Sequence, residues 1–106
     1  MTEVLQRILA RTELVPPPEG KEHLGPCRLW LGPPNKGYGQ VRYAGKVHRV
    51  HRLVWQLRHG RPVPAGMELD HTCERKLCVD HTEPVTHAEN MRRRWYGHVP
   101  ALTPLR

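Results

Sequence analysis

The stretch LDHTCERKLCVDHTEPVTHAEN, residues 69–90, concentrates the chemistry of this chain. It holds two of the three cysteines and three of the eight histidines. Asp70 and His71 open it, soft metal ligands follow, and Asn90 closes it. A histidine flanked by such ligands, with a carboxamide that a short hairpin and helix can return beside it, is typical of metal-dependent chemistry. We therefore interpret the stretch as two adjoining metal sites, one structural and one catalytic.

The spacing of the soft ligands predicts the structural site. Cys73, Cys78 and His81 place three ligands close together in the chain. Structural zinc takes four protein ligands, and Cys27 is the cysteine that remains. His87 is an alternative to His81, but it falls on the helix that we expect to follow. We favour Zn²⁺ on Cys27 and the other three ligands over the alternative of three unconnected thiols.

Composition supports a structural metal. The 106 residues suffice for one domain, but they include no Phe and only 38% hydrophobic residues. A domain of this size is weakly stabilised by its core alone. Three cysteines do not fit a disulfide framework, because one would be left over. We expect the protein in a reducing cytosol, that of a bacterium or of a phage-infected host.

The charge indicates a polyanionic partner. Seventeen Lys and Arg against ten Asp and Glu give a formal charge of +7. Small basic domains of this kind usually bind nucleic acid. No apolar run approaches the roughly 18 to 20 residues of a membrane span, and the N-terminus lacks the apolar core of a signal peptide. We therefore expect no membrane partner.

The N-terminal segment reads as a short amphipathic helix over Thr2–Thr12. Thr2 is the expected N-cap. The apolar residues share one face of the helix; they are Val4, Leu5, Ile8 and Leu9. The prolines 16–18 end the helix and form a stiff linker. Whether the helix packs on the domain or on a partner stays open.

The middle of the chain alternates as strands do. Residues 27–32 read as a strand with Leu29 and Leu31 on one face and Arg28 and Trp30 on the other. Residues 38–43 and 46–50 then form a hairpin across Ala44-Gly45. In this hairpin we expect Val41 and Tyr43 to point inward and Arg42 to point outward.

From about Val50 the apolar period changes to that of a helix, which should end at Gly60. Leu53, Val54 and Leu57 form its core face, and the polar face carries His51, Arg52, Arg58 and His59. Two antiparallel strands, Met67–Asp70 and Glu83–Val85, should precede a last helix over His87–Trp95. Thr86 and Glu89 form a capping box for that helix. The tail from Gly97 onward looks irregular.

His71 and Asn90 carry the catalytic prediction. The zinc ligands beside His71 would fix its backbone, and a neutral imidazole held in this way can take a proton from water. The carbonyl oxygen of Asn90 is a suitable ligand for Mg²⁺. A cation bound by few protein oxygens, with a phosphate completing its shell, suits phosphodiester cleavage.

These residues together resemble a known family. The motifs are Gly37-Tyr38-Gly39, His51-Arg52-Leu53-Val54, Asp70-His71 with the cysteines, and Thr86-His87-Ala88-Glu89-Asn90-Met91. They are similar to the HNH and His-Cys box endonucleases of the ββα-metal fold, also called His-Me fingers, and most of all to zinc-bearing HNH proteins of phages and mobile introns. The resemblance covers roughly residues 27–94.

The resemblance implies a role for each matching residue. His71 would be the general base, and Asn90 would bind the catalytic cation, Mg²⁺ or Mn²⁺. Asp70 would either join Asn90 on that cation or only shape the hairpin. Cys27, Cys73, Cys78 and His81 would hold the zinc. The family often has an Asn-Pro-x-His step after the second cysteine, whereas Asp80 here runs straight into His81, so the loop is about two residues shorter.

The arginines are the predicted DNA contacts. A guanidinium matches a phosphate with two hydrogen bonds, so one arginine is expected on the scissile phosphate, Arg52 first and Arg49 second. The others would position the DNA backbone without reading its sequence; they are Arg42, Arg92, Arg93 and Arg94. The alternative for Arg92–Arg94 is a solvated helix face.

We thus predict an α+β fold, a small zinc-stapled ββα-metal domain with a central β-hairpin and an N-terminal helix. Residues 1–20 form the helix and linker, 21–97 the nuclease domain and 98–106 the tail. The expected function is metal-dependent cleavage of double-stranded DNA, as a nickase if the protein is a monomer, which we favour. The alternative is a zinc-stabilised DNA-binding module without catalysis. A protein-interaction zinc domain fits the charge less well.

Overall fold

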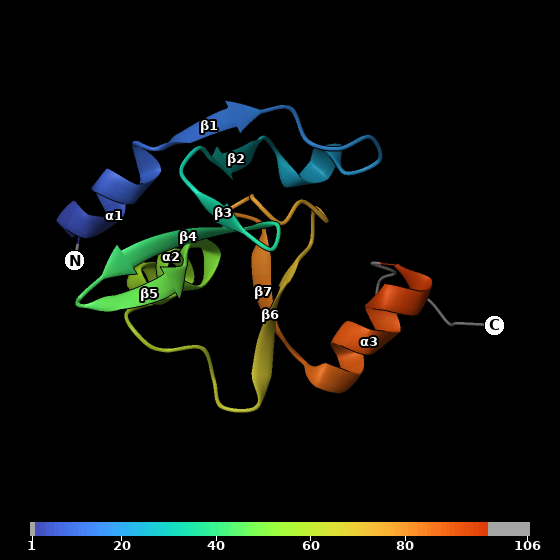
Figure 1. Ribbon diagram of the computed structural model, residues 1–106. Helices are drawn as coiled ribbons and strands as arrows, with labels where there is room; N and C mark the ends of the chain where they lie inside the picture. Colours follow the sequence, from blue (N-terminus) through green and yellow to red (C-terminus); the bar gives the residue numbers. More distant parts are fainter. Residues whose placement is uncertain (1, 98–106) are drawn as a thin grey trace.

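The computed structural model describes residues 2–97 and shows a small α+β domain (Figure 1). Its elements follow in the order α1 (Thr2–Leu9), β1 (Thr12–Val15), η1 (Glu22–Leu24, a 3₁₀ turn), β2 (Cys27–Trp30), β3 (Pro34–Asn35), β4 (Tyr38–Tyr43), β5 (Lys46–Arg49), α2 (Val50–His59), β6 (Met67–His71), β7 (Thr82–Thr86) and α3 (His87–Tyr96). The predicted tail over residues 98–106 lies outside the described part.

The strands form small antiparallel sheets rather than one large sheet. β1 pairs with β2, β4 lies between β3 and β5, and β6 pairs with β7. In Figure 1 the β6–β7 hairpin runs through the centre, with α3 on one side and the β4–β5 hairpin with α2 on the other. None of the helices in the described part is long and apolar enough to cross a membrane.

The N-terminal helix packs on the domain, which the sequence left open. Ile8 is buried in the same cluster as Leu53 and Val54 of α2, and the other apolar residues of α1 pack against that cluster. The helix ends at Leu9, earlier than predicted, and the Thr12 hydroxyl donates a hydrogen bond to the Leu9 carbonyl. Thr12 instead begins β1, in register with Trp30 of β2.

Trp30 sets the packing of β2. Its indole is 3% exposed, whereas Leu31, predicted to continue the strand, is 62% exposed and lies beyond its end. A Cβ added at Gly39 would lie 2.6 Å from the Trp30 ring, so β4 can cross the indole only with glycine there. Trp30 thereby brings β4 against the same core as α1 and α2.

The central hairpin and the second helix agree with the sequence, with one exception. Ala44 and Gly45 turn the chain with positive φ angles of 53° and 79°, and Val41 and Tyr43 pack on the core. Gly60 ends α2 in a left-handed conformation. The prediction that His51 lies on the polar face of this helix is wrong. His51 is buried, because its ring packs against Tyr38 of β4 and His71 at the end of β6.

The segment that positions the site folds as predicted. Met67 pairs with Thr86, and His71 with Thr82, along β6 and β7. The Thr86 hydroxyl accepts a hydrogen bond from the Glu89 backbone N–H and caps α3. The α3 residues remain at least partly exposed, so this helix presents side chains rather than filling the core.

Candidate active site and metal centre

The loop between β6 and β7 gathers the four predicted soft ligands. Cys73 and Cys78 lie in that loop, His81 stands just before β7, and Cys27 begins β2. The four ligand atoms lie within 4.8 Å of one another, and the three cysteines are fully or almost fully buried. The cluster replaces hydrophobic packing at this end, since within residues 2–97 the hydrophobic side chains that pack around it are Val15, Leu24 and Leu29.

The geometry of the cluster suits zinc. The Nδ1 atom of His81 lies 3.5 Å from the Cys27 sulfur and 3.6 Å from the Cys78 sulfur. Two zinc bonds of about 2.3 Å to sulfur and about 2.0 Å to nitrogen, at a tetrahedral angle, separate their ligand atoms by about 3.5 Å. The sulfur and nitrogen ligands therefore already stand at the spacing that a shared zinc ion requires.

The surroundings of His81 determine which of its two ring nitrogens is available to a metal ion. Its Nε2 lies 2.9 Å from the Leu24 carbonyl oxygen, an acceptor, so Nε2 carries the proton and Nδ1 presents a lone pair to the sulfurs. A carbonyl partner of this kind is the usual support of a metal-bound histidine. The cluster can therefore hold a metal ion through Nδ1 of His81.

The thiols themselves favour a cation. The hydrogen bond from Cys73 lowers the pKa of Cys78 to about 4, and the same contact raises the pKa of the Cys73 thiol. Burial raises the pKa of Cys27. One thiolate is thus easily formed, and further ionisation in this buried place requires a positive ion at the centre.

Asp80 lies in the part of the loop that is shorter in this chain than in the family it resembles. Its carboxylate accepts from Arg58 of α2 at 2.7 Å and from Arg28 of β2 at 3.2 Å. His87, the alternative zinc ligand, lies on α3, with its Nδ1 2.8 Å from Glu68. The structure therefore gathers His81, and not His87, with the cysteines.

His71 stands at the end of β6, beside the metal cluster but outside it. It is 8% exposed, and its Nε2 lies 3.0 Å from the Cys78 carbonyl oxygen. Nε2 therefore donates, which leaves Nδ1 as the atom able to accept a proton. Burial lowers the pKa of His71, so the ring stays neutral at neutral pH.

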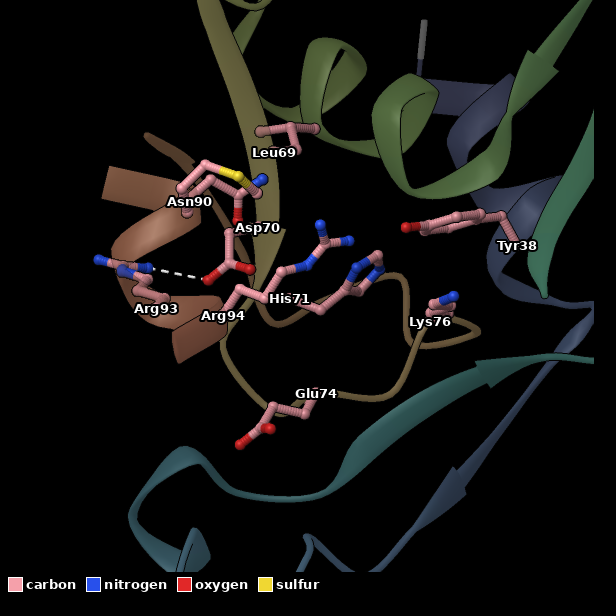
Figure 2. Close-up of a pocket in the computed structure, with 10 residues that line it drawn as sticks. Tyr38, Leu69, Asp70, His71, Glu74, Lys76, Asn90, Arg93 and Arg94 are labelled. Carbon is pink, nitrogen blue, oxygen red and sulfur yellow. Dashed lines mark hydrogen bonds and ion pairs between the residues drawn. The ribbon is translucent and has the colours of Figure 1, made fainter. Parts of the chain in front are cut away.

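His71, Asp70 and Asn90 share one open pocket of about 380 Å³, whereas Arg52, the third residue predicted to be catalytic, does not line it. Figure 2 shows Asp70 and Asn90 on the α3 side, Tyr38 and Lys76 on the opposite side, and His71 between them. Because β6 and β7 pair through Asp70 and Glu83, and α3 follows directly, the strand end and the first helical turns meet at this pocket.

Two acidic residues organise the α3 side of the pocket. Arg93 lies 2.9 Å from Asp70, and both side chains are largely buried (Figure 2). The Asn90 side-chain N–H donates to Glu68 at 2.6 Å, which leaves the Asn90 carbonyl oxygen to other partners. Glu68 is not among the residues predicted from the sequence, although the alternation of β6 places Glu68 and Asp70 on one face.

A second pocket, of about 690 Å³, adjoins the first, and Tyr38, Leu69 and Asn90 line both. Arg49 and Arg52 line the second pocket, so they neighbour His71 without sharing its pocket. The Arg49 guanidinium lies 4.2 Å from the centre of the Tyr38 ring. The two pockets together form one open surface flanked by cations.

The remaining predicted arginines separate into different environments. Arg94 lines the pocket of His71, and Arg42 is exposed on β4. Arg92 and Arg93 both bond Glu89, and Arg93 is 17% exposed. The solvated-face alternative is therefore wrong for Arg93, which acidic partners hold against the site.

Comparisons with known proteins fit this site. A family model described as HNH endonuclease matches residues 48–92, which run from β5 to α3. Protein 7.7 of Escherichia phage T7 is 36% identical over 55 residues, which cover 51% of this chain and 42% of that protein. The match thus spans less than half the length of that relative. No solved structure matches at the same level of significance. Residues 48–92 of this chain, which carry His71 and Asn90, are thus similar to the HNH endonuclease domain.

Proposed function

We propose that the protein is a metal-dependent endonuclease that hydrolyses phosphodiester bonds of double-stranded DNA. One observation carries the proposal: a buried, neutral histidine with its acceptor nitrogen free of the Cys78 carbonyl lines the same pocket as Asp70 and Asn90. A protein that only bound DNA would need neither the base nor the oxygen ligands in that arrangement.

In this proposal His71 is the general base. Its Nδ1 takes a proton from water, and the resulting hydroxide attacks phosphorus in line with the departing oxygen. The P–O3′ bond breaks, which leaves a 5′-phosphate and a 3′-oxygen that takes up a proton. The Cys78 carbonyl holds the ring in the required tautomer throughout, because Nε2 keeps its own proton.

Asp70 and Asn90 are the proposed ligands of the catalytic cation. A carboxylate and a carboxamide are oxygen donors of the type that Mg²⁺ and Mn²⁺ prefer. Glu68 fixes the Asn90 amide so that its nitrogen faces away from that role. A divalent cation bound there would supply positive charge to the phosphate and its leaving oxygen.

The second proposed metal is structural. Zn²⁺ on Cys27, Cys73, Cys78 and His81 would join the start of β2 to the loop that carries His71. Burial of the three cysteines excludes water from the cluster, which suits a closed structural site rather than a catalytic one.

The proposed DNA path crosses both pockets. Arg94 and Lys76 line the pocket of His71, and Lys46, Arg49 and Arg52 line the neighbouring one. We propose that the first pair contacts the phosphate that is cut. Arg52, predicted to contact the phosphate that is cut, would then contact the DNA backbone next to that phosphate. Its guanidinium group could still orient the DNA there through two hydrogen bonds.

Nicking of a supercoiled plasmid tests the function. Protein carrying zinc should convert the plasmid to the open circle with Mg²⁺ or Mn²⁺ and not without added divalent metal. One active site per monomer predicts open circle before linear DNA. Binding without cleavage in any of these metals would favour the alternative, a zinc-stabilised DNA-binding module.

A further inference from the structure

His51 and His71 are the two buried polar side chains among the described residues, at 7% and 8% exposed, and they contact each other. Their ring centres lie 4.5 Å apart. His71 has a partner in the Cys78 carbonyl and a role in the proposed reaction. Nothing in that reaction uses His51, whose burial therefore needs its own explanation.

The burial of His51 costs stability in the free protein. Its Nδ1 is sealed from solvent and has no hydrogen-bond partner within residues 2–97. A buried polar atom without a partner costs free energy that an apolar ring of similar shape would not. The Tyr38 ring stacks on His51 with ring centres 5.4 Å apart, but a hydrocarbon ring at position 51 would pack against Tyr38 equally well.

The place of His51 indicates a ligand. Its ring lines the second pocket, and with Nδ1 sealed, Nε2 is the nitrogen able to reach a molecule bound there. The buried Nδ1 of His51 has no partner in the described part of the chain, and it costs less free energy without a proton than with one, because an unprotonated nitrogen leaves no N–H donor unpaired. The proton then sits on Nε2, and the ring offers a donor to the pocket. Burial lowers the pKa of His51 to about 3, so this donor is neutral.

The surroundings of His51 favour an anion. Lys46, Arg49 and Arg52 line the same pocket, and none of these cations forms an ion pair with an acidic residue of the described part. The pocket also opens beside the first turn of α2, which has no acidic residue and no side-chain cap, so its backbone N–H groups add positive potential. The acidic Glu68 of this pocket is engaged by Asn90 and His87.

We propose that His51 Nε2 and the Arg49 and Arg52 guanidinium groups form a phosphate subsite for the backbone phosphate that flanks the one being cut. The proposal rests on the proposed function and deepens it. Contact between His51 and His71 places this subsite beside the general base, so a flanking phosphate seated there fixes the register of the strand over His71. His51 acts as a binding residue and donates one neutral hydrogen bond.

The decisive variant is His51→Phe, which keeps a ring and removes both nitrogens. Binding of a fluorescent duplex is measured without divalent metal, together with zinc content and the melting temperature. We expect duplex affinity to fall roughly tenfold or more, the scale of one lost hydrogen bond to a charged group, while the melting temperature stays the same or rises. A histidine kept only for packing would give the reverse, wild-type affinity with a lower melting temperature, and would overturn the proposal.

The salt dependence separates His51 from the arginines. A neutral donor releases no counterion, so His51→Phe should leave the slope of log affinity against log salt unchanged, whereas Arg52→Ala should reduce it by about 0.9. An equal reduction in both variants would overturn the neutral-donor assignment. If Phe prevents folding, His51→Leu is measured in its place.

The matched control is His59→Phe, because His59 also stacks on an aromatic ring of α2, Trp55, at 4.1 Å but lines neither pocket. It should bind duplex as the wild type does. The outcomes stay distinct from those of the proposed function, since binding is read without cleavage. If the wild-type protein binds duplex but never nicks it, only the nuclease proposal is contradicted. If the wild-type protein nicks and His51→Phe binds duplex with unchanged affinity, only the phosphate subsite is contradicted.

Discussion

His81 and His71 stand at the two ends of one loop and are held in the same way, yet they face different surroundings. Each donates from Nε2 to a backbone carbonyl, His81 to Leu24 and His71 to Cys78, at 2.9 Å and 3.0 Å. The Nδ1 atom of His81 faces two cysteine sulfurs, whereas His71 lines an open pocket with carboxylate and amide oxygens. The same support would thus serve a metal ligand at one end and the proposed base at the other, because the neighbours of Nδ1 differ.

The largest effect is expected at the His81 end. His81→Ala or Cys78→Ser removes a ligand from the metal cluster, and structural zinc contributes about 10 kcal/mol or more in small zinc domains. We expect loss of bound zinc by elemental analysis and loss of cooperative unfolding in circular dichroism. A fully folded His81→Ala protein that still holds one zinc would show that the two histidines do not divide these roles.

The next effect belongs to the His71 end. His71→Ala should retain zinc and the melting temperature within a few degrees, while the nicking rate falls by about 10²–10⁴, the usual contribution of a general base. Because burial lowers the pKa of His71, the wild-type rate should rise with pH only below about 6.5 and then level off. A rate that still climbed steeply above pH 7 would assign the base to another group.

Glu68 sharpens the comparison, because it acts on the pocket through Asn90. Glu68→Ala releases the Asn90 amide and should raise the Mg²⁺ concentration for half-maximal nicking by about 10- to 100-fold, with partial recovery at high Mg²⁺. Glu13→Ala, an exposed acid on β1, is the matched control and should behave as wild type. Loss of activity at every Mg²⁺ concentration would contradict a supporting role.

The smallest effect concerns stability against pH. The folded protein keeps His51 neutral to about pH 3, whereas an unfolded imidazole takes up a proton near pH 6.5. The unfolded state therefore binds more protons between these values, and stability from this group is complete above pH 6.5 and is lost as the pH falls. Between pH 7 and pH 5 the wild type should lose about 2 kcal/mol more than His51→Phe, measured by urea unfolding. Equal losses would place His51 in a solvated position.

Sequence reasoning succeeded where the information is local. The alternation on either side of Ala44-Gly45 predicted the central hairpin, and Thr86 before an acidic residue at the third position predicted the start of α3. It failed where a distant segment competes. Thr12 continues a helical pattern, but pairing with Trp30 draws it into a strand. His51 lies on the polar side of its helix by periodicity, and packing against Tyr38 of β4 and His71 of β6 buries it.

The sequence by itself determined the ligand types and their order, because Cys73, Cys78 and His81 lie within one loop and His71 stands directly before it. The tertiary structure decided what completes each site. Cys27 reaches the cluster through β2, which pairs with β1 and bridges to Cys78 through Leu29. The packing of β6, β4 and α2 brings Glu68 against Asn90, and Tyr38 and His51 against His71. Such contacts join segments far apart in the chain, so no local spacing encodes them, and the shared core fixes them instead.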